Sequence, residues 1–229
     1  MSIKPSKLSV AQLTGQTAEL LAPLSGEIVL HRDVIQPFLN LCQLAAKQGI
    51  DLRVASGYRS FDRQCHIWNS KVNGQRPVLD ADSRPLDVAK LSDKELIFAI
   101  LRWSALPGAS RHHWGTDMDV WDGAAVDQCY KLQLTPEEYG CEGPFFALTQ
   151  WLASAEVEAL GFVRPYRTDC GGVAPEAWHL SFMPVAAGFE RALSANVLAT
   201  VIEPADILLK DRVLQHLEEI YERFVVNRS

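Results

Sequence analysis

Two short stretches of the chain carry the residue types that a catalytic metal site needs. Residues 110–119 read SRHHWGTDMD, and residues 176–179 read EAWH. A zinc ion that takes part in catalysis is commonly held by three nitrogen or carboxylate-oxygen ligands. Its fourth position stays open, and a carboxylate stands nearby to move a proton. The two stretches together supply such a set and therefore predict a zinc site that does chemistry.

Within these stretches we interpret His112, Asp119 and His179 as the three ligands. Glu176, three residues before the last ligand, is then free to act as a base. The spacing differs from that of a helical His-Glu-x-x-His motif and from that of paired cysteines. The three ligands and the base would have to be brought together by the fold.

The two stretches also follow a known order of motifs, Ser-x-His-x-x-Gly-x-x-x-Asp and then Glu-x-Trp-His. Upstream lies a third element, residues 56–60 (SGYRS), with a glutamine five residues after its arginine. In these three elements the chain resembles the zinc D-Ala-D-Ala carboxypeptidases and dipeptidases. This is the family of VanY- and VanX-like peptidases, which includes L,D-carboxypeptidases that trim peptidoglycan stems. The resemblance covers about residues 30–183.

The resemblance implies roles for the remaining motif residues. Glu176 would accept the proton of an attacking water and return it to the departing amine, and Arg59 would stabilise the negative oxygen that forms. Ser110 and Gln64 would hold the terminal substrate residue. Trp178 would be a wall of the site, although a purely packing role is equally compatible with its position. The implied cofactor is one zinc ion.

Two neighbours of the ligands leave alternatives open. His113 adjoins His112 and could replace it, although the Ser-x-His spacing and the seven-residue step to Asp119 favour His112. Asp117 would share a strand face with Asp119 because side chains alternate along a strand. The family pattern usually has a small residue there, so Asp117 could contact a histidine N–H instead of a metal.

The function that the resemblance implies is a zinc metallopeptidase acting as a carboxypeptidase. It would release a C-terminal D-amino acid, D-Ala, from peptidoglycan stem peptides or recycled muropeptides. The sequence leaves D,D and L,D specificity open. One alternative is an endopeptidase on the same scaffold, and the other is a non-catalytic zinc-binding module like the Hedgehog N-terminal domain. An intact base, arginine and ligand set argue against the second.

Composition limits the other classes of function. The chain has 229 residues, is 48% hydrophobic and carries a net charge of −6, which favours a globular protein without a nucleic-acid footprint. The five cysteines are scattered and odd in number, so we expect buried free thiols and no disulfide framework. The sequence gives no basis for an oligomeric state.

No stretch reads as a signal peptide or a membrane span. We therefore expect a cytoplasmic enzyme acting on recycled wall fragments, with a periplasmic location as the alternative. Finding the native protein only in a periplasmic fraction would contradict this expectation.

The expected fold is α+β, with a small and largely antiparallel sheet flanked by helices and the zinc at the face of the sheet. We expect an N-terminal extension over 1–29, a zinc peptidase domain over 30–186 and a helical C-terminal extension over 187–229 that packs on the same domain. The Gly-, Pro- and charge-rich segment 70–90 predicts a long loop. Alternation over 130–134 predicts a strand, and helical spacing over 205–224 predicts an amphipathic helix.

Overall fold

The computed structural model describes residues 7–228. Its helices and strands follow one another along the chain as α1 (Val10–Leu13), β1 (Leu21–Ser25), β2 (Ile28–His31), α2 (Arg32–Lys47), β3 (Leu52–Ser56), α3 (Phe61–Val72), η1 (Val88–Lys90), α4 (Asp93–Leu101), η2 (Arg111–Trp114), β4 (Asp117–Asp122), α5 (Pro136–Tyr139), α6 (Phe146–Leu152), α7 (Ala155–Ala159), β5 (Phe162–Val163), β6 (His179–Phe182), α8 (Met183–Ala192), α9 (Ala195–Ile202), α10 (Lys210–Gln215), α11 (Leu217–Ile220) and the π-helical turn η3 (Tyr221–Val226).

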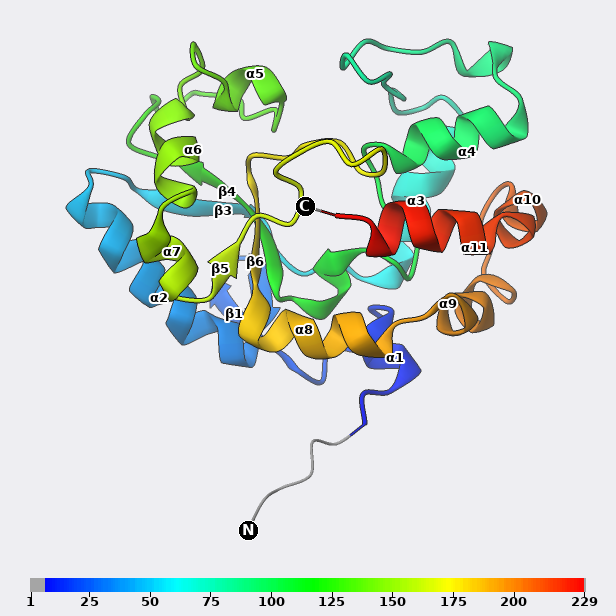
Figure 1. The fold of residues 1–229 in the computed structure, drawn as a ribbon, viewed down its shortest axis with the longest axis horizontal. Coiled ribbons are helices and arrows are strands. Elements are labelled where there is room, and N and C mark those ends of the chain that lie inside the picture. Colours follow the sequence, from blue (N-terminus) through cyan, green and yellow to red (C-terminus); the bar gives the residue numbers. More distant parts are fainter. Residues whose placement is uncertain (1–6, 229) are drawn as a thin grey trace.

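A four-stranded sheet lies at the centre, with strand order β3-β4-β6-β5 and antiparallel pairing throughout. Strands β1 and β2 form a separate antiparallel hairpin. Figure 1 shows the helices arranged around the sheet. The predicted α+β class with a small antiparallel sheet is thereby confirmed.

Two hydrophobic clusters hold the helices in place. One cluster joins the sheet residues Met118 and Val120 to α2, α6 and α7. The other joins α3 and α4 to the C-terminal helices and includes Trp68 and Leu198, both fully buried. In Figure 1 the first group of helices lies at the left and α3, α4 and α9 to α11 lie at the right. Burial of this apolar surface provides most of the stabilisation.

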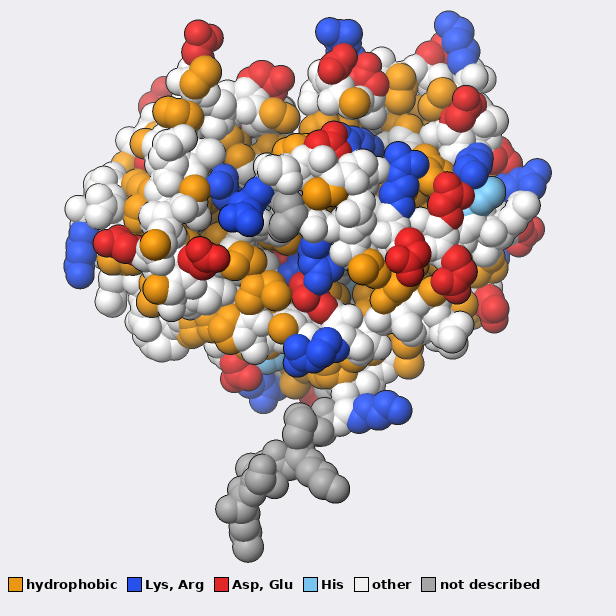
Figure 2. All heavy atoms as spheres, in the orientation of Figure 1, with side chains coloured by type: hydrophobic (Ala, Val, Ile, Leu, Met, Phe, Trp, Pro, Cys, Tyr) orange, Lys and Arg blue, Asp and Glu red, His pale blue; other side chains and the backbone are white. Residues whose placement is uncertain are grey.

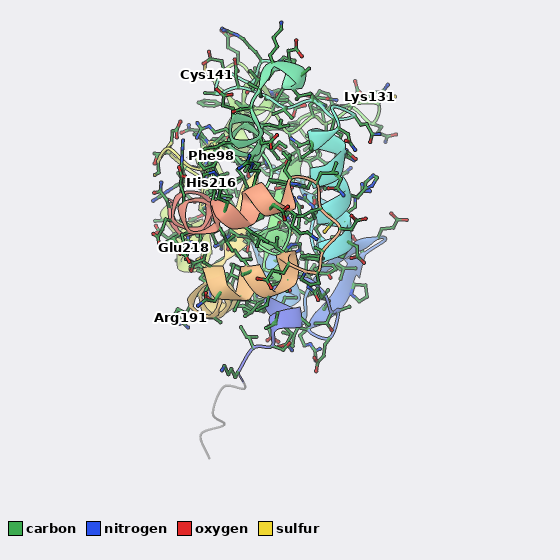
Figure 3. The ribbon with its side chains drawn as sticks, turned by 90° about the vertical axis from the view of Figure 1, so that its right-hand side faces the viewer. Phe98, Lys131, Cys141, Arg191, His216 and Glu218 are labelled. Atoms are coloured by element: carbon green, nitrogen blue, oxygen red, sulfur yellow. The ribbon has the colours of Figure 1, made fainter. Side chains whose placement is uncertain are left out.

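The C-terminal residues pack on the domain but do not form the single helix predicted over 205–224. The chain takes a positive φ of 59° at Leu209, and α10 begins only after it. A second break at His216 separates α10 from α11, and a π-helical turn completes the segment. The ring of His216 meets Phe98 of α4 edge-on at 6.3 Å between centroids (Figure 3). Short helices that pack on α4 and α9 thus replace one regular helix.

The strand predicted over 130–134 is wrong, because this segment forms a loop. The carboxylate of Glu138 accepts hydrogen bonds from the backbone N–H groups of Gln133 and Thr135 and from the hydroxyl of Tyr130. Leu134 has a positive φ of 56°, which a strand does not allow. A local side-chain acceptor therefore takes the N–H groups that a strand partner would need.

The cysteines differ in part from expectation. All five are free thiols, and Cys42 and Cys65 are half-buried. The other three, Cys129, Cys141 and Cys170, are exposed, so the prediction that they are buried is wrong. They all lie in loops between short elements, where hydrophobicity alone does not lead to burial.

No single helix within residues 7–228 is long and apolar enough to cross a membrane. Helices α8 and α9 pass a length and composition test only as a pair, and they are bent by 76° relative to each other. On the face in Figure 2, Lys and Arg side chains are interspersed with Asp and Glu.

Candidate metal centre

The three predicted ligands come from three neighbouring elements. His112 lies in η2, Asp119 in β4 and His179 at the start of β6. In the β4–β6 ladder Asp119 is directly opposite His179, so the pairing register sets their side chains side by side. Gly115 ends η2 with a φ of 67°, and a Cβ there would lie 2.6 Å from the backbone nitrogen of His31. A glycine is therefore needed for the tight turn that links His112 to β4.

These three side chains are buried and converge. One potential ligand atom from each lies within 4.8 Å of the others. The Nε2 of His112 and the Nδ1 of His179 are each 3.5 Å from Oδ1 of Asp119. The structure thus brings together the ligand set that the sequence predicts.

Hydrogen bonds on the far sides of both imidazoles fix which nitrogen faces the cluster. The Nδ1 of His112 lies 2.8 Å from the backbone oxygen of Gly57, and the Nε2 of His179 lies 3.0 Å from Oδ1 of Asp117. Each of these nitrogens must carry the hydrogen, because its partner only accepts. The opposite nitrogen points into the cluster, and in the neutral ring it has a lone pair that a metal could take. Two imidazole nitrogens and one carboxylate oxygen arranged in this way fit a zinc ion.

Asp117 is a partner of a ligand and lies outside the three-residue cluster. Besides His179, its carboxylate contacts Nε of Arg111 at 2.6 Å and accepts from the hydroxyls of Thr116 and Ser181. Burial alone would raise the pKa of this carboxyl, but Arg111 and His179 lower it overall. Asp117 therefore stays ionised and orients the ring of His179. Of the two alternatives that the sequence leaves open, the structure favours the contact with a histidine N–H.

A chain of charges extends from the buried Asp117 to the half-buried Glu190 and Arg228 in the C-terminal part of the molecule. Arg111 is only 5% exposed and contacts Asp117, the Ser181 hydroxyl and Glu190 of α8. Glu190 also pairs with Arg228 at 2.6 Å. Burial alone would lower the pKa of Arg111, but the carboxylates raise it. Sequence reasoning missed this chain because its members are distant in sequence and belong to none of the motifs.

His113 is excluded as a ligand by its own hydrogen bonds. Its Nδ1 lies 2.6 Å from the backbone oxygen of Arg59, and its Nε2 accepts from the backbone N–H of Gly108 at 3.0 Å. Burial lowers the pKa of His113 to about 3, so the ring is neutral. Both nitrogens are occupied, and the residue ties the loop before η2 to the backbone of Arg59.

Glu176 stands next to the cluster. Its Oε2 lies 3.3 Å from Nδ1 of His179, the nitrogen that faces the other ligands. Its backbone N–H donates to the backbone oxygen of Tyr166. The ring of Tyr166 meets that of His179 edge-on, with 5.0 Å between the ring centroids. Tyr166 is a second residue that sequence reasoning missed, because it stands outside the motifs. Glu176 is thus placed where a base beside the metal would be needed.

Arg59 is held by its neighbours at the edge of the same site. Its guanidinium donates to Oε1 of Gln64 at 3.1 Å and to Oγ of Ser56 at 3.3 Å. Its backbone N–H donates to the backbone oxygen of His112. Burial lowers the pKa of Arg59, opposed by Asp119 and Glu176. An arginine remains charged even so.

Gln64 differs from the predicted substrate contact. It is fully buried, and its amide is used by Arg59 and by the backbone oxygen of Ala105, to which it donates at 2.7 Å. Gln64 therefore positions the guanidinium from behind. The helical spacing of α3 could not predict this contact, because spacing alone does not show which loop packs against a buried side chain.

A cavity of about 400 Å³ opens over the cluster. Arg59, Ser110, Glu176 and Trp178 line it together with the ligands. Its wall also includes residues from the end of α3, from the loop that follows it and from α11 and η3, namely Lys71, Arg76, Leu79, Ile220, Phe224 and Val225. Four of the five predicted catalytic and substrate-binding residues thus face one cavity.

We expect Asp117→Asn to lower zinc affinity by about 10- to 100-fold, the usual effect of removing the partner of a metal-bound histidine. The asparagine keeps the shape but loses the charge that holds His179 and Arg111. Competition with a chromogenic chelator would measure the affinity. Asp122→Asn is a matched control, because Asp122 is a buried carboxylate of the same strand whose bonds go to backbone N–H groups. Equal losses of zinc affinity in both variants would show that Asp117 supports the fold in general and does not act on the metal site.

Comparison with known proteins adds an independent observation. The model of one protein family, described as VanY, D-alanyl-D-alanine carboxypeptidase, matches residues 27–185. Two uncharacterized proteins of Haemophilus influenzae are similar in sequence. One is 33% identical over 123 residues, 53% of this chain and 93% of the relative, and the other is 44% identical over 104 residues, 44% of this chain and 71% of the relative.

Solved structures show the same fold. VanYB in complex with D-alanine-D-alanine is 20% identical with a TM-score of 0.52, covering 81% of this chain and 89% of that chain. A VanY mutant in complex with Zn(II) is 22% identical with a TM-score of 0.51, covering 86% and 92%. The LD-carboxypeptidase LdcB is 20% identical with a TM-score of 0.50, covering 97% and 80%.

Proposed function

Because the chain belongs to the VanY family of D-alanyl-D-alanine carboxypeptidases, we propose that it is a zinc-dependent carboxypeptidase that removes a C-terminal D-amino acid, D-Ala, from peptidoglycan stem peptides or recycled muropeptides. One observation carries the proposal. His112, Asp119 and His179 converge within 4.8 Å in a cavity that Glu176 and Arg59 also line.

The choice of zinc and of substrate rests on further support. Each imidazole, when neutral, can offer a lone pair to the cluster beside a carboxylate, and a VanY mutant with this fold is solved with Zn(II). VanYB, also of this fold, is solved with D-alanine-D-alanine. The cavity of about 400 Å³ is large enough for a few residues at the end of a peptide.

In the reaction, zinc held by the three ligands would supply Lewis-acid activation of water and of the scissile carbonyl. Glu176 would take the proton from the attacking water on its Oε2 and then give it to the nitrogen of the departing amine. Amide nitrogen leaves poorly unless it is protonated, so the same carboxyl group serves both steps.

Arg59 would stabilise the negative charge that develops on the carbonyl oxygen. Ser56 and Gln64 hold its guanidinium, so the cation is in position before the reaction begins. His113 holds the backbone of the same residue. Ser110 and Trp178 would contact the terminal residue from the cavity wall.

Mass spectrometry of the products tests the proposal. The zinc-loaded protein and its Glu176→Ala variant would be incubated with muropeptides ending in D-Ala and with free D-Ala-D-Ala. Loss of a single D-Ala that depends on Glu176 is the expected result, and the stem that reacts would distinguish D,D from L,D specificity. Internal cleavage would replace the proposal with an endopeptidase. Zinc binding without any cleavage would favour a non-catalytic module.

A further inference from the structure

Two cations, Lys71 and Arg76, line the metal cavity. Lys71 lies in the last turn of α3 and Arg76 in the loop that follows, and both are half-buried. Among residues 7–228, no carboxylate pairs with either of them. Other partly or fully buried arginines of this chain, such as Arg102 and Arg111, do form ion pairs.

This arrangement has an electrostatic cost in the free protein. Burial lowers the pKa of Lys71, Arg76 lowers it further, and only Glu176 acts in the opposite direction. Removing a cation from water without an opposite charge is unfavourable, and placing two cations in one cavity adds repulsion. An anion that enters the cavity would relieve both effects.

The role of these cations differs from that of Arg59. The guanidinium of Arg59 already donates to Gln64 and Ser56, and its position follows from them. Within residues 7–228, the side chains of Lys71 and Arg76 donate no hydrogen bond to another residue. They lie outside the three sequence motifs, although within the span of the family match.

Another part of the cavity wall is apolar. Ile220, Phe224 and Val225 contribute to it from α11 and η3. A ligand that fits both parts would combine a carboxylate with a short aliphatic group, as the end of a peptide does. A polyanion would have little room, since the cavity measures about 400 Å³.

We propose that Lys71 and Arg76 form a carboxylate-binding subsite, which holds a carboxylate of the peptide substrate while the scissile bond lies at Glu176. This inference rests on the proposed peptidase function. The carboxylate has two possible sources, the free C-terminus of the peptide or an acidic residue further along the stem. In either case the subsite selects the peptide by its charge and sets which bond reaches Glu176.

The test combines three protein variants with three forms of one substrate. Lys71→Met, Arg76→Met and the double variant would be compared with the wild type. The substrate would be a stem peptide ending in D-Ala, the same peptide with a C-terminal carboxamide, and the same peptide with its internal carboxylate amidated. Arg191→Met is the control, because Arg191 is exposed on α8 and does not line the cavity (Figure 3).

We expect each single variant to raise KM by about tenfold, the equivalent of one charge-assisted hydrogen bond, with kcat changed by less than about threefold. On the peptide whose amidated group is the recognised one, the variants should cause no further loss. This identifies the terminal or the internal carboxylate as the source. An unchanged KM in the double variant on all three peptides would overturn the subsite, as would a rise that is equal on all of them.

A binding measurement separates this inference from the proposed function. Calorimetric titration of the zinc-loaded Glu176→Gln protein with the same peptides reports affinity without turnover. If the wild type cleaves none of the peptides but binding still depends on Lys71 and Arg76, the proposed function fails and the subsite stands. If cleavage is normal and binding is the same with and without the two cations, the subsite fails alone.

Discussion

Replacing Glu176 with glutamine is expected to lower kcat by about 10²- to 10⁴-fold, the range that a single general base contributes. Glutamine preserves the shape of the side chain beside His179 but cannot accept a proton. The protein should still bind zinc, because Glu176 is not among the three ligands that converge. Steady-state release of D-Ala and the zinc content of the same preparation would be measured together.

Glu158→Gln provides the control for this substitution. Glu158 is an exposed carboxylate on α7, so its replacement removes the same charge at a distance from the cavity. It should leave kcat unchanged. A Glu176→Gln protein with normal zinc content and wild-type kcat would show that another group takes the proton.

Replacing Arg59 with methionine is expected to reduce kcat by about 10²- to 10³-fold, as the loss of one donor to a developing oxyanion does. Arg59→Lys should recover only part of the rate. Lysine restores the charge, but its ammonium lacks the planar fork that here meets both Gln64 and Ser56. Separate determination of kcat and KM would show the effect in kcat.

The control is Arg63→Met, because Arg63 is an exposed arginine of α3 only four residues away. It should behave like the wild type. If Arg59→Met instead raised KM alone, Arg59 would bind the substrate equally in the ground state and the transition state. Its role in the proposed mechanism would then be wrong.

The ligand set was predictable because its motifs are short and follow one another in a fixed order. His112 and Asp119 are only seven residues apart, and strand pairing brings His179 to them. The partners of the ligands were less accessible. Arg111 directly precedes the ligand His112 in the sequence. Its ion-pair partner Glu190, however, lies 79 residues away on a helix outside the motifs. A single sequence does not show which residues so far apart along the chain are neighbours in space.

The misplaced elements share a physical cause, which is competition from tertiary or side-chain contacts. The alternation over 130–134 favoured a strand, but Glu138 takes the N–H groups that the strand would use. Of the positions that this helical spacing placed inward, Leu217 and Phe224 are buried but Leu208 is exposed, and the breaks at Leu209 and His216 went undetected. Periodicity thus indicated only part of the buried face and none of the breaks. The predicted boundaries at residues 30 and 186 stay predictions.

The chain of charges from Asp117 through Arg111 and Glu190 to Arg228 limits how freely the catalytic unit could be moved between proteins. The span that matches the family ends at residue 185, before Glu190. Grafting that span alone into another chain would leave the Arg111 guanidinium buried with one carboxylate in place of two. Loss of a partner from a buried ion pair typically costs about 3–5 kcal/mol. We therefore expect the active site to need the C-terminal helices for its stability.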